Sequence, residues 1–355
     1  MEVGIFGGAE YPGMFIWPAS PGTTDPETTL LATNQAFEIY ELADELGLDH
    51  VSVSEHHYGG RMDPNPLITA AVLAQRLKRA RIMVLGRTVP LGNPVLLAEE
   101  LGQLDVLMNG RLEVALLRGT PNEYVTYFTN PQESRAMLAE AVELMRAAWT
   151  EPDPFGWEGR YYQFRTVAAL PRPIQAGGPR ILLSGNSDES ARFAARQRAM
   201  IGISYTPSEF VPGLIALYRE AAEETGWTPD ASDILYRNYV YVAETDEQAE
   251  AEAARHGFGD ASVHFVPRAE GMGAALGEVF RNYSFKGITT KPRFCGSPES
   301  VIAQLREFND LGVGRVDLTF SGSGLPHELG RRNLELFAAE VLPAIRAFEP
   351  AEVAA

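Results

Sequence analysis

The stretch NGRLEVALLRGTPNEY, residues 109–124, contains a helix end, a buried strand and a candidate ligand-binding turn. Asn109 and Gly110 suit a helix end because glycine adopts the left-handed conformation of a C-terminal cap. The segment LEVALL at 112–117 is short and mostly apolar, which is typical of a strand buried on both faces. Arg118 follows at the carboxyl end of that strand, where parallel α/β folds bind ligands. The stretch therefore predicts a parallel α/β fold with a ligand near Arg118.

The turn after this strand suits a phosphate group. The planar guanidinium of Arg118 can donate two parallel hydrogen bonds to a phosphate. Gly119 allows close approach of the backbone, and Pro121 stiffens the turn. The alternative is an ordinary ion pair between Arg118 and a nearby carboxylate such as Glu123.

Composition limits the class of protein. The chain has 355 residues, a net charge of −17 and 45% hydrophobic residues, which is typical of a globular protein. The charge argues against nucleic acid or an anionic membrane surface as a partner. The single cysteine, Cys295, excludes an internal disulfide and a cysteine-rich metal site. The start MEVGIFGG does not resemble an export signal, and no apolar run is long enough for a membrane span, so we expect a cytoplasmic protein.

Strand-like and helix-like segments alternate along the chain. About eight such units favour a closed (β/α)8 TIM barrel over an open sheet, with 1–355 as a single barrel domain. Residues 150–179 interrupt the pattern and are interpreted as an insertion, with a hairpin inside it. Residues 257–293 are rich in glycine and aromatic residues and are interpreted as a lid-like insertion after strand seven, with a structural excursion as the alternative. The predicted strands are Val3–Phe6, His50–Ser54, Arg81–Thr88, Leu112–Leu117, Ile181–Ser184, Met200–Tyr205, Ile234–Ala243 and Arg315–Phe320.

Two further strand ends carry candidate site residues. After the second strand, His56 and His57 suit general acid–base chemistry, although one of them could equally be a buried, hydrogen-bonded structural residue. Adjacent residues leaving a strand point to opposite sides, so joint metal ligation is awkward and no metal site is expected. In the third strand, Gly86 marks either close approach of a ligand or packing against a large neighbour.

The fifth strand runs into Gly185, Asn186 and Ser187 before a helix. Asn186 and Glu189 have the spacing of a capping box, which is the structural interpretation. The free amides of the first helical turn, with the hydroxyls of Ser187 and Ser190, could instead hold a phosphate. Together the strand ends predict one mouth with a phosphate site on one side and a histidine on the other.

Four segments resemble the bacterial luciferase-like family of flavin-dependent monooxygenases. They are SEHHYGGRMDPNP at 54–66, VLGRTVPLGNPVLLAEELGQLDVLMNGRLEVALLRGTPNE at 84–123, LPRPIQAGGPRILLSGNSDESARFAA at 170–195 and FCGSPESVIAQL at 294–305. The resemblance covers nearly the whole chain and implies a luciferase-like (β/α)8 barrel with insertions.

The resemblance also implies roles for individual residues. His56 matches the active-site histidine, and Arg118 matches the arginine that binds the flavin phosphate, beside Gly119. Leu85 and Gly86 match a non-prolyl cis peptide under the flavin ring. The phosphate-binding turn of the family matches Gly185, Asn186, Ser187 and Ser190, although luciferase itself carries an acidic residue at the position of Asn186.

The implied activity is oxygenation of a small organic substrate with reduced FMN and O2 through a C4a-peroxyflavin. A separate flavin reductase would supply the reduced FMN, and a homodimer is common in the family. Three alternatives remain open. They are an F420-dependent hydride-transfer oxidoreductase of the same fold, a non-catalytic flavin-binding partner subunit and a metal-dependent barrel hydrolase.

Overall fold

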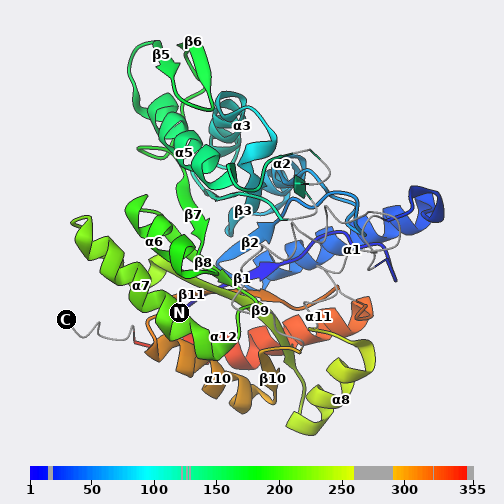
Figure 1. The fold of residues 1–355 in the computed structure, drawn as a ribbon. Helices are drawn as coiled ribbons and strands as arrows, with labels where there is room; N and C mark the ends of the chain where they lie inside the picture. The colour runs from blue at the N-terminus through cyan, green and yellow to red at the C-terminus, as the bar shows by residue number, and fades with distance from the viewer. Residues whose placement is uncertain are drawn as a thin grey trace.

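Eight parallel strands close into a barrel in the computed structural model, as predicted (Figure 1). The model describes residues 1–14, 19–120, 123–124, 127, 129–259, 291–322 and 324–349. The barrel strands are β1 (Glu2–Phe6), β2 (His50–Val53), β3 (Arg81–Thr88), β4 (Leu112–Leu117), β7 (Arg180–Ser184), β8 (Met200–Ser204), β9 (Ile234–Val242) and β11 (Arg315–Thr319). They lie in this order around the barrel, which closes where β8 pairs with β9 and β11 with β1.

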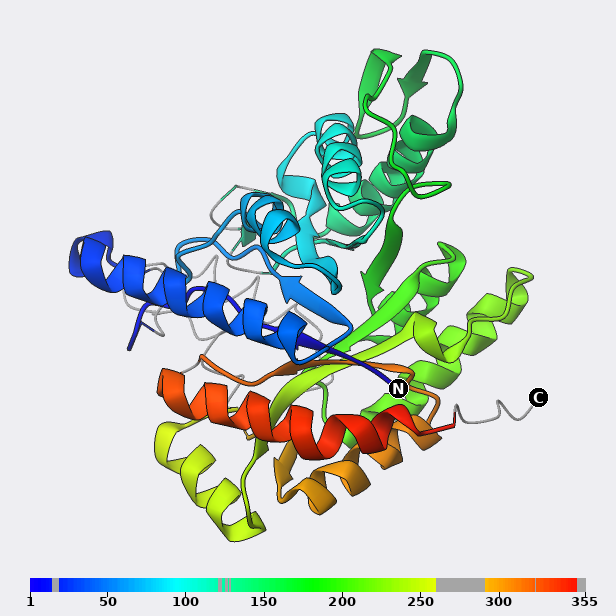
Figure 2. The same cartoon turned by 180° about the vertical axis from the view of Figure 1, so that it is seen from behind.

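Helices cover the outside of the barrel (Figures 1 and 2). Their inner faces pack with the outward side chains of the strands into the main apolar core. No helix among the described residues is long and apolar enough to span a bilayer. The helices are α1 (Pro26–Glu45), α2 (Pro66–Arg76), α3 (Pro94–Leu107), α5 (Ser134–Thr150), α6 (Asp188–Arg196), α7 (Val211–Glu224), α8 (Asp246–His256), α10 (Pro298–Asp310), α11 (His327–Leu336) and α12 (Leu342–Arg346).

Several helices begin at a polar residue followed by proline. Asn93 accepts hydrogen bonds from the amides of Val95 and Leu96 at 2.9 and 3.2 Å, and Pro94 occupies the first helical position. Asn65 and Ser297 cap α2 and α10 in the same way. Proline suits this position because its fixed φ is helical and its missing N–H would have had no partner. The helix starts are therefore set by local sequence.

Three short strands lie outside the predicted eight. The hairpin of β5 (Phe155–Glu158) and β6 (Gln163–Val167) projects beside α5, at the top of Figure 1. The Glu140 carboxylate on α5 holds it by accepting hydrogen bonds from the amides of Tyr161 and Tyr162 at 3.0 and 2.9 Å. Strand β10 (Phe294–Gly296) extends the sheet beside β9. Most of the lid-like insertion predicted at 257–293 lies outside the described residues.

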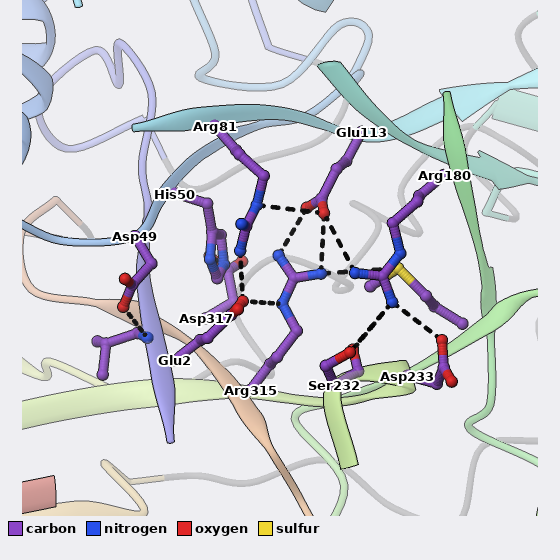
Figure 3. A network of polar contacts seen from close by, with 12 residues as sticks. Glu2, Asp49, His50, Arg81, Glu113, Arg180, Ser232, Asp233, Arg315 and Asp317 are labelled. Carbon is purple, nitrogen blue, oxygen red and sulfur yellow. Dashed lines mark hydrogen bonds and ion pairs between the residues drawn. The ribbon is translucent and has the colours of Figure 1, made fainter. Parts of the chain in front are cut away.

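Charged side chains fill the amino end of the barrel interior (Figure 3). Arg315, on β11, is fully buried and donates two hydrogen bonds to Glu113, on β4, at 2.6 and 3.1 Å. Its Nε lies 3.1 Å from Glu2 at the start of β1. The buried His50 ring fits because Gly4 faces it, and a Cβ on Gly4 would lie 2.0 Å from the ring. An apolar layer lies above these charges and is formed by Phe6, Met83, Leu85, Ala115, Leu182, Met200 and Leu235.

Candidate functional site

A cavity of about 250 Å³ lies at the carboxyl end of the barrel. It brings together most of the site residues that the sequence predicts. The predicted residues that line it are His56, Leu85, Gly86, Arg118, Gly119, Asn186 and Ser190. Gly185 and Ser187 lie next to lining residues without lining the cavity themselves.

The strand β3 contributes a backbone surface to this cavity. The peptide bond between Leu85 and Gly86 is cis, at the position that the family resemblance indicates. Gly86 faces β4 closely, because an added Cβ would lie 2.6 Å from the Leu117 side chain and 2.8 Å from the Ala115 carbonyl oxygen. The packing explanation for Gly86 therefore holds. Because Gly86 has no side chain, it lines the cavity with its backbone.

The two histidines have different environments. His57 is held on both ring nitrogens, with Nε2 2.9 Å from Glu55 Oε1 and Nδ1 3.0 Å from Tyr127 Oη. The side chain of His56 is 42% exposed, and its Nδ1 lies 3.8 Å from Oε1 of the buried Glu123. We therefore assign the structural role to His57, whereas Nε2 of His56 has no hydrogen-bond partner among the described residues.

Two buried carboxylates support these histidines. Burial alone would raise the pKa of Glu55. The contact with His57 and the charge of Arg87 lower it by more, so the pKa of Glu55 lies below its ordinary value. Arg87, unexplained by the sequence, is thus the counter-ion of Glu55. Burial also raises the pKa of Glu123, and His56 and Thr120 reverse that effect and lower it. Both carboxylates are ionised at neutral pH.

Arg118 also lines the cavity, and none of the described carboxylates pairs with it. Glu123, the alternative partner, instead accepts hydrogen bonds from the amide and hydroxyl of Thr120. Among the described residues, the Arg118 side chain makes no ion pair or hydrogen bond. An arginine without a counter-ion in a cavity indicates a site for an anion.

A second arginine, Arg135 at the start of α5, faces the same region. Its Nε lies 2.9 Å from Glu189, and both its terminal nitrogens lie 3.5 Å from the Ser190 hydroxyl. Burial and the charge of Arg118, which lines the same cavity, lower the pKa of Arg135. Two arginines, a serine hydroxyl and the amino end of α6 form a donor set suited to a phosphate dianion.

The capping box predicted for Asn186 and Glu189 is wrong. Ser187 is the N-cap of α6, and its hydroxyl accepts a hydrogen bond from the Ser190 amide. The Asn186 amide instead joins the turn to β8, donating to the Ser204 carbonyl at 2.9 Å and accepting from the Ser204 amide at 2.8 Å. Glu189 is mostly exposed, and its carboxylate pairs with Arg135 at 2.9 Å.

Sequence reasoning missed Arg135. One signal was present, because Arg135 lies in the first turn of α5, where the helix dipole disfavours a cation. A basic residue at that position does not stabilise the helix, so its presence indicates another role. Within the described ranges, no group of histidine, cysteine and acidic side chains could hold a metal ion.

Comparison with known proteins identifies the family. The family model described as luciferase-like monooxygenase matches residues 13–315. The chain belongs to the luciferase-like monooxygenase family. Relatives in this family differ in cofactor, and some are named as F420-dependent dehydrogenases.

Individual relatives show the range of this luciferase-like family. The oxygenase component of flavin-dependent trigonelline monooxygenase from Acinetobacter baylyi is 22% identical, over 90% of this chain and 92% of that protein. The F420-dependent glucose-6-phosphate dehydrogenase of Nocardia farcinica is 28% identical, over 87% of this chain and 93% of that protein. The oxygenating constituent of 3,6-diketocamphane monooxygenase from Pseudomonas putida, solved with FMN, shares the fold with a TM-score of 0.76 at 20% identity, over 99% of this chain and 100% of that one.

Proposed function

We propose that this chain is the oxygenase of a two-component monooxygenase that uses reduced FMN and O2 to oxygenate a small organic substrate. The observation that carries the proposal is Arg118, which has no counter-ion among the described residues and lines the same cavity as Arg135 and His56. One cavity lined by these groups suits a mononucleotide, with its phosphate at the arginines and its ring near His56. When bound, reduced FMN supplies the electrons that activate O2.

The residues of the chain have separate tasks in this proposal. Arg118 and Arg135 bind the phosphate, with Ser190 and the amides of α6 as further donors. The backbone of Leu85 and Gly86 supports the flat ring, since it presents no side chain there. The turn residues Gly185, Asn186 and Ser187, with Gly119 beside Arg118, shape the phosphate site, and Asn186 does so through β8.

His56 moves the proton in this proposal. Its Nδ1 faces the ionised Glu123, so a proton on Nδ1 is favoured and Nε2 is left to accept or donate a proton at the reacting centre. Glu123 holds the tautomer and orientation from a buried position, 3.8 Å away. Apolar and aromatic side chains of the cavity, Phe6, Leu117 and Leu182 among them, exclude water from the reaction.

We also propose a homodimer and a separate flavin reductase as partners. Apolar side chains are exposed on α2 and α3, which pack side by side. Ile68 and Val72 on α2 are 65% and 37% exposed, and Leu96 and Leu107 on α3 are 53% and 47% exposed. A face of this kind on neighbouring helices is typical of a protein–protein interface, and we assign it to a second copy of the chain. A cytoplasmic location stays a prediction.

Anaerobic mixing experiments test the cofactor assignment. The protein is loaded with photochemically reduced FMN and then exposed to O2 in a stopped-flow spectrophotometer. We expect the reoxidation of flavin to differ from that of free reduced FMN and to depend on the protein. Stoichiometric binding of F420 with no binding of FMN would favour the hydride-transfer alternative. Binding of FMN without any effect on its reoxidation would favour a non-catalytic flavin-binding subunit.

A further inference from the structure

The cavity wall carries buried polar atoms that lack hydrogen-bond partners among the described residues. Ser54, Thr319 and Arg237 are 3%, 5% and 8% exposed, and all three line the cavity. Among the described residues, the Ser54 hydroxyl, the Thr319 hydroxyl and Nε of Arg237 find no hydrogen-bond partner. Buried polar groups without partners are costly, so their presence on a cavity wall indicates a ligand that completes them.

Arg237 is the charged member of this set. Its guanidinium carbon lies 3.0 Å from the centroid of the Phe6 ring and 4.8 Å from that of Tyr205, so two aromatic rings pack against the group. Nη2 donates to the Tyr205 hydroxyl at 2.8 Å. No described residue accepts a hydrogen bond from Nε or Nη1. The rings therefore fix the guanidinium while part of its edge stays free to donate.

The counter-charge of Arg237 is shared with other groups. Asp317 lies 4.0 Å away, beyond hydrogen-bond distance. Its other carboxylate oxygen accepts a hydrogen bond from Ser52 at 2.9 Å and lies 3.3 Å from His50. Arg237 is thus a buried cation that its nearest carboxylate compensates only in part. A second anion on the free edge of the guanidinium would complete the compensation.

The position of Arg237 separates it from the proposed flavin site. Around the barrel β9 lies opposite β3, and β11 lies opposite β4. A flavin ring on the backbone of Leu85 and Gly86, with its phosphate at Arg118, would therefore occupy the β3 and β4 side. The space left beside β9 and β11 has Arg237 and Thr319 in its wall.

We propose that Arg237 and Thr319 bind an anionic oxygen of the organic substrate, which makes the substrate class a small organic acid. The inference rests on the proposed function, because it assigns the rest of the cavity to FMN. The guanidinium would donate to a carboxylate of the acid, and the Thr319 hydroxyl would donate to its second oxygen. Phe6, Tyr205 and Tyr239, which line the same wall, would contact the carbon skeleton of the acid.

The test compares benzoate with benzamide, a neutral molecule of nearly the same shape. Each is titrated into the protein saturated with oxidised FMN, and binding is measured by isothermal calorimetry. FMN occupies the Arg118 site, so benzoate cannot bind there. We expect benzoate to bind at least about tenfold more tightly than benzamide, the scale of a hydrogen bond to a charged group. The preference should disappear in Arg237→Met and fall severalfold in Thr319→Val.

Three controls separate the outcomes. Arg192→Met removes an equal charge from the outer surface, where Arg192 pairs with Glu220, and should keep the preference for benzoate. If Arg237→Met does not fold because Asp317 loses its partner, Arg237→Met combined with Asp317→Asn removes both charges together. Fluorescence quenching measures FMN affinity separately, and failure of wild-type protein to bind FMN would refute the proposed function.

Two results would overturn the inference while FMN binds normally. The first is equal affinity of the wild-type complex for benzoate and benzamide. The second is a tenfold or greater loss of FMN affinity in Arg237→Met, because Arg237 would then serve the flavin and not the substrate.

Discussion

Both ends of the barrel interior contain buried charges, but the pairing of these charges differs between the two ends. At the amino end each charged side chain drawn in Figure 3 lies near an opposite charge, and Arg315 and Arg81 each contact both Glu113 and Glu2. At the carboxyl end Arg118 has no partner among the described residues, and Arg237 has only a carboxylate at 4.0 Å. Arginine therefore occurs in two different electrostatic environments within one barrel.

This difference separates structural charges from candidate functional ones. A buried ion pair with good geometry compensates its own desolvation, so it needs no ligand. A buried or half-buried cation without a partner costs free energy in the isolated protein, and a ligand can recover that cost. In TIM barrels the amino end usually serves stability and the carboxyl end catalysis. The charge balance of this chain gives a physical reason for that division.

The largest expected effect is at the amino end. Arg315→Met should lower the free energy of unfolding by about 3–5 kcal/mol, because it leaves the buried Glu113 carboxylate without its main partner. Urea unfolding followed by circular dichroism measures the change. Arg331→Met, which removes an exposed pair with Glu335, is the control and should cost less than about 1 kcal/mol. Equal costs for the two variants would contradict the structural role of the network.

A change at the carboxyl end should affect the reaction and leave stability nearly unchanged. His56→Ala should slow oxygenation roughly 100-fold, the lower range for loss of a general acid or base, while FMN affinity stays near that of the wild type. Single-turnover oxygenation of the bound substrate measures the rate. His57→Ala is the matched comparison and should mainly lower stability, since His57 is held by Glu55 and Tyr127. A larger rate loss in His57→Ala would reverse the two roles.

The sequence was sufficient for the barrel because each buried parallel strand forms a short apolar run between helices. The exceptions have identifiable causes. Strand β10 has only three residues, which is too short for any periodicity. A π-helical turn at Phe337–Val341 separates α11 from α12, and apolar spacing does not reveal that widened turn.

The site was predicted in part for similar reasons. His56, Leu85, Gly86 and Arg118 lie at strand ends, so strand topology alone brings them to one mouth. The N-cap of α6 was misplaced by one residue because asparagine and serine are both good caps, and only β8 shows that Asn186 is already bonded. The pairing of Arg315 with Glu113 joins positions 202 residues apart and depends on barrel register, which local sequence does not encode.

Loss of the phosphate-binding arginine should have an intermediate effect. Arg118→Ala should weaken FMN binding by about 1.5–3 kcal/mol, or roughly 10-fold to 100-fold, because a charge-assisted hydrogen bond is lost. Its free energy of unfolding should not fall, since no described carboxylate loses a partner. Fluorescence quenching of FMN and urea unfolding measure the two quantities. Riboflavin, which lacks the phosphate, should bind Arg118→Ala and wild type equally, and an equal loss for riboflavin would place Arg118 elsewhere.

The smallest effect concerns acid stability and compares one carboxylate from each end. Burial raises the pKa of Glu113, but Arg315 lowers it more, so its folded pKa lies below the ordinary value of 4.5. A lowered pKa contributes stability that is complete above about pH 4.5 and is lost as the pH falls through the folded pKa. Glu113→Gln should therefore have a shallower loss of stability below pH 4.5 than the wild type. The pKa of Glu123 is also lowered, through His56 and Thr120.

Glu123→Gln should change this acid slope less than Glu113→Gln. The cation facing Glu113 is a permanently charged arginine that donates two hydrogen bonds, whereas Glu123 has a half-exposed histidine at 3.8 Å. Urea unfolding at a series of pH values from 6 down to about 3 gives both slopes. Each variant is compared with its own value at pH 6, which removes the constant cost of the substitution. A steeper dependence on Glu123 would mean that the carboxyl end, and not the amino end, holds the more strongly compensated charge.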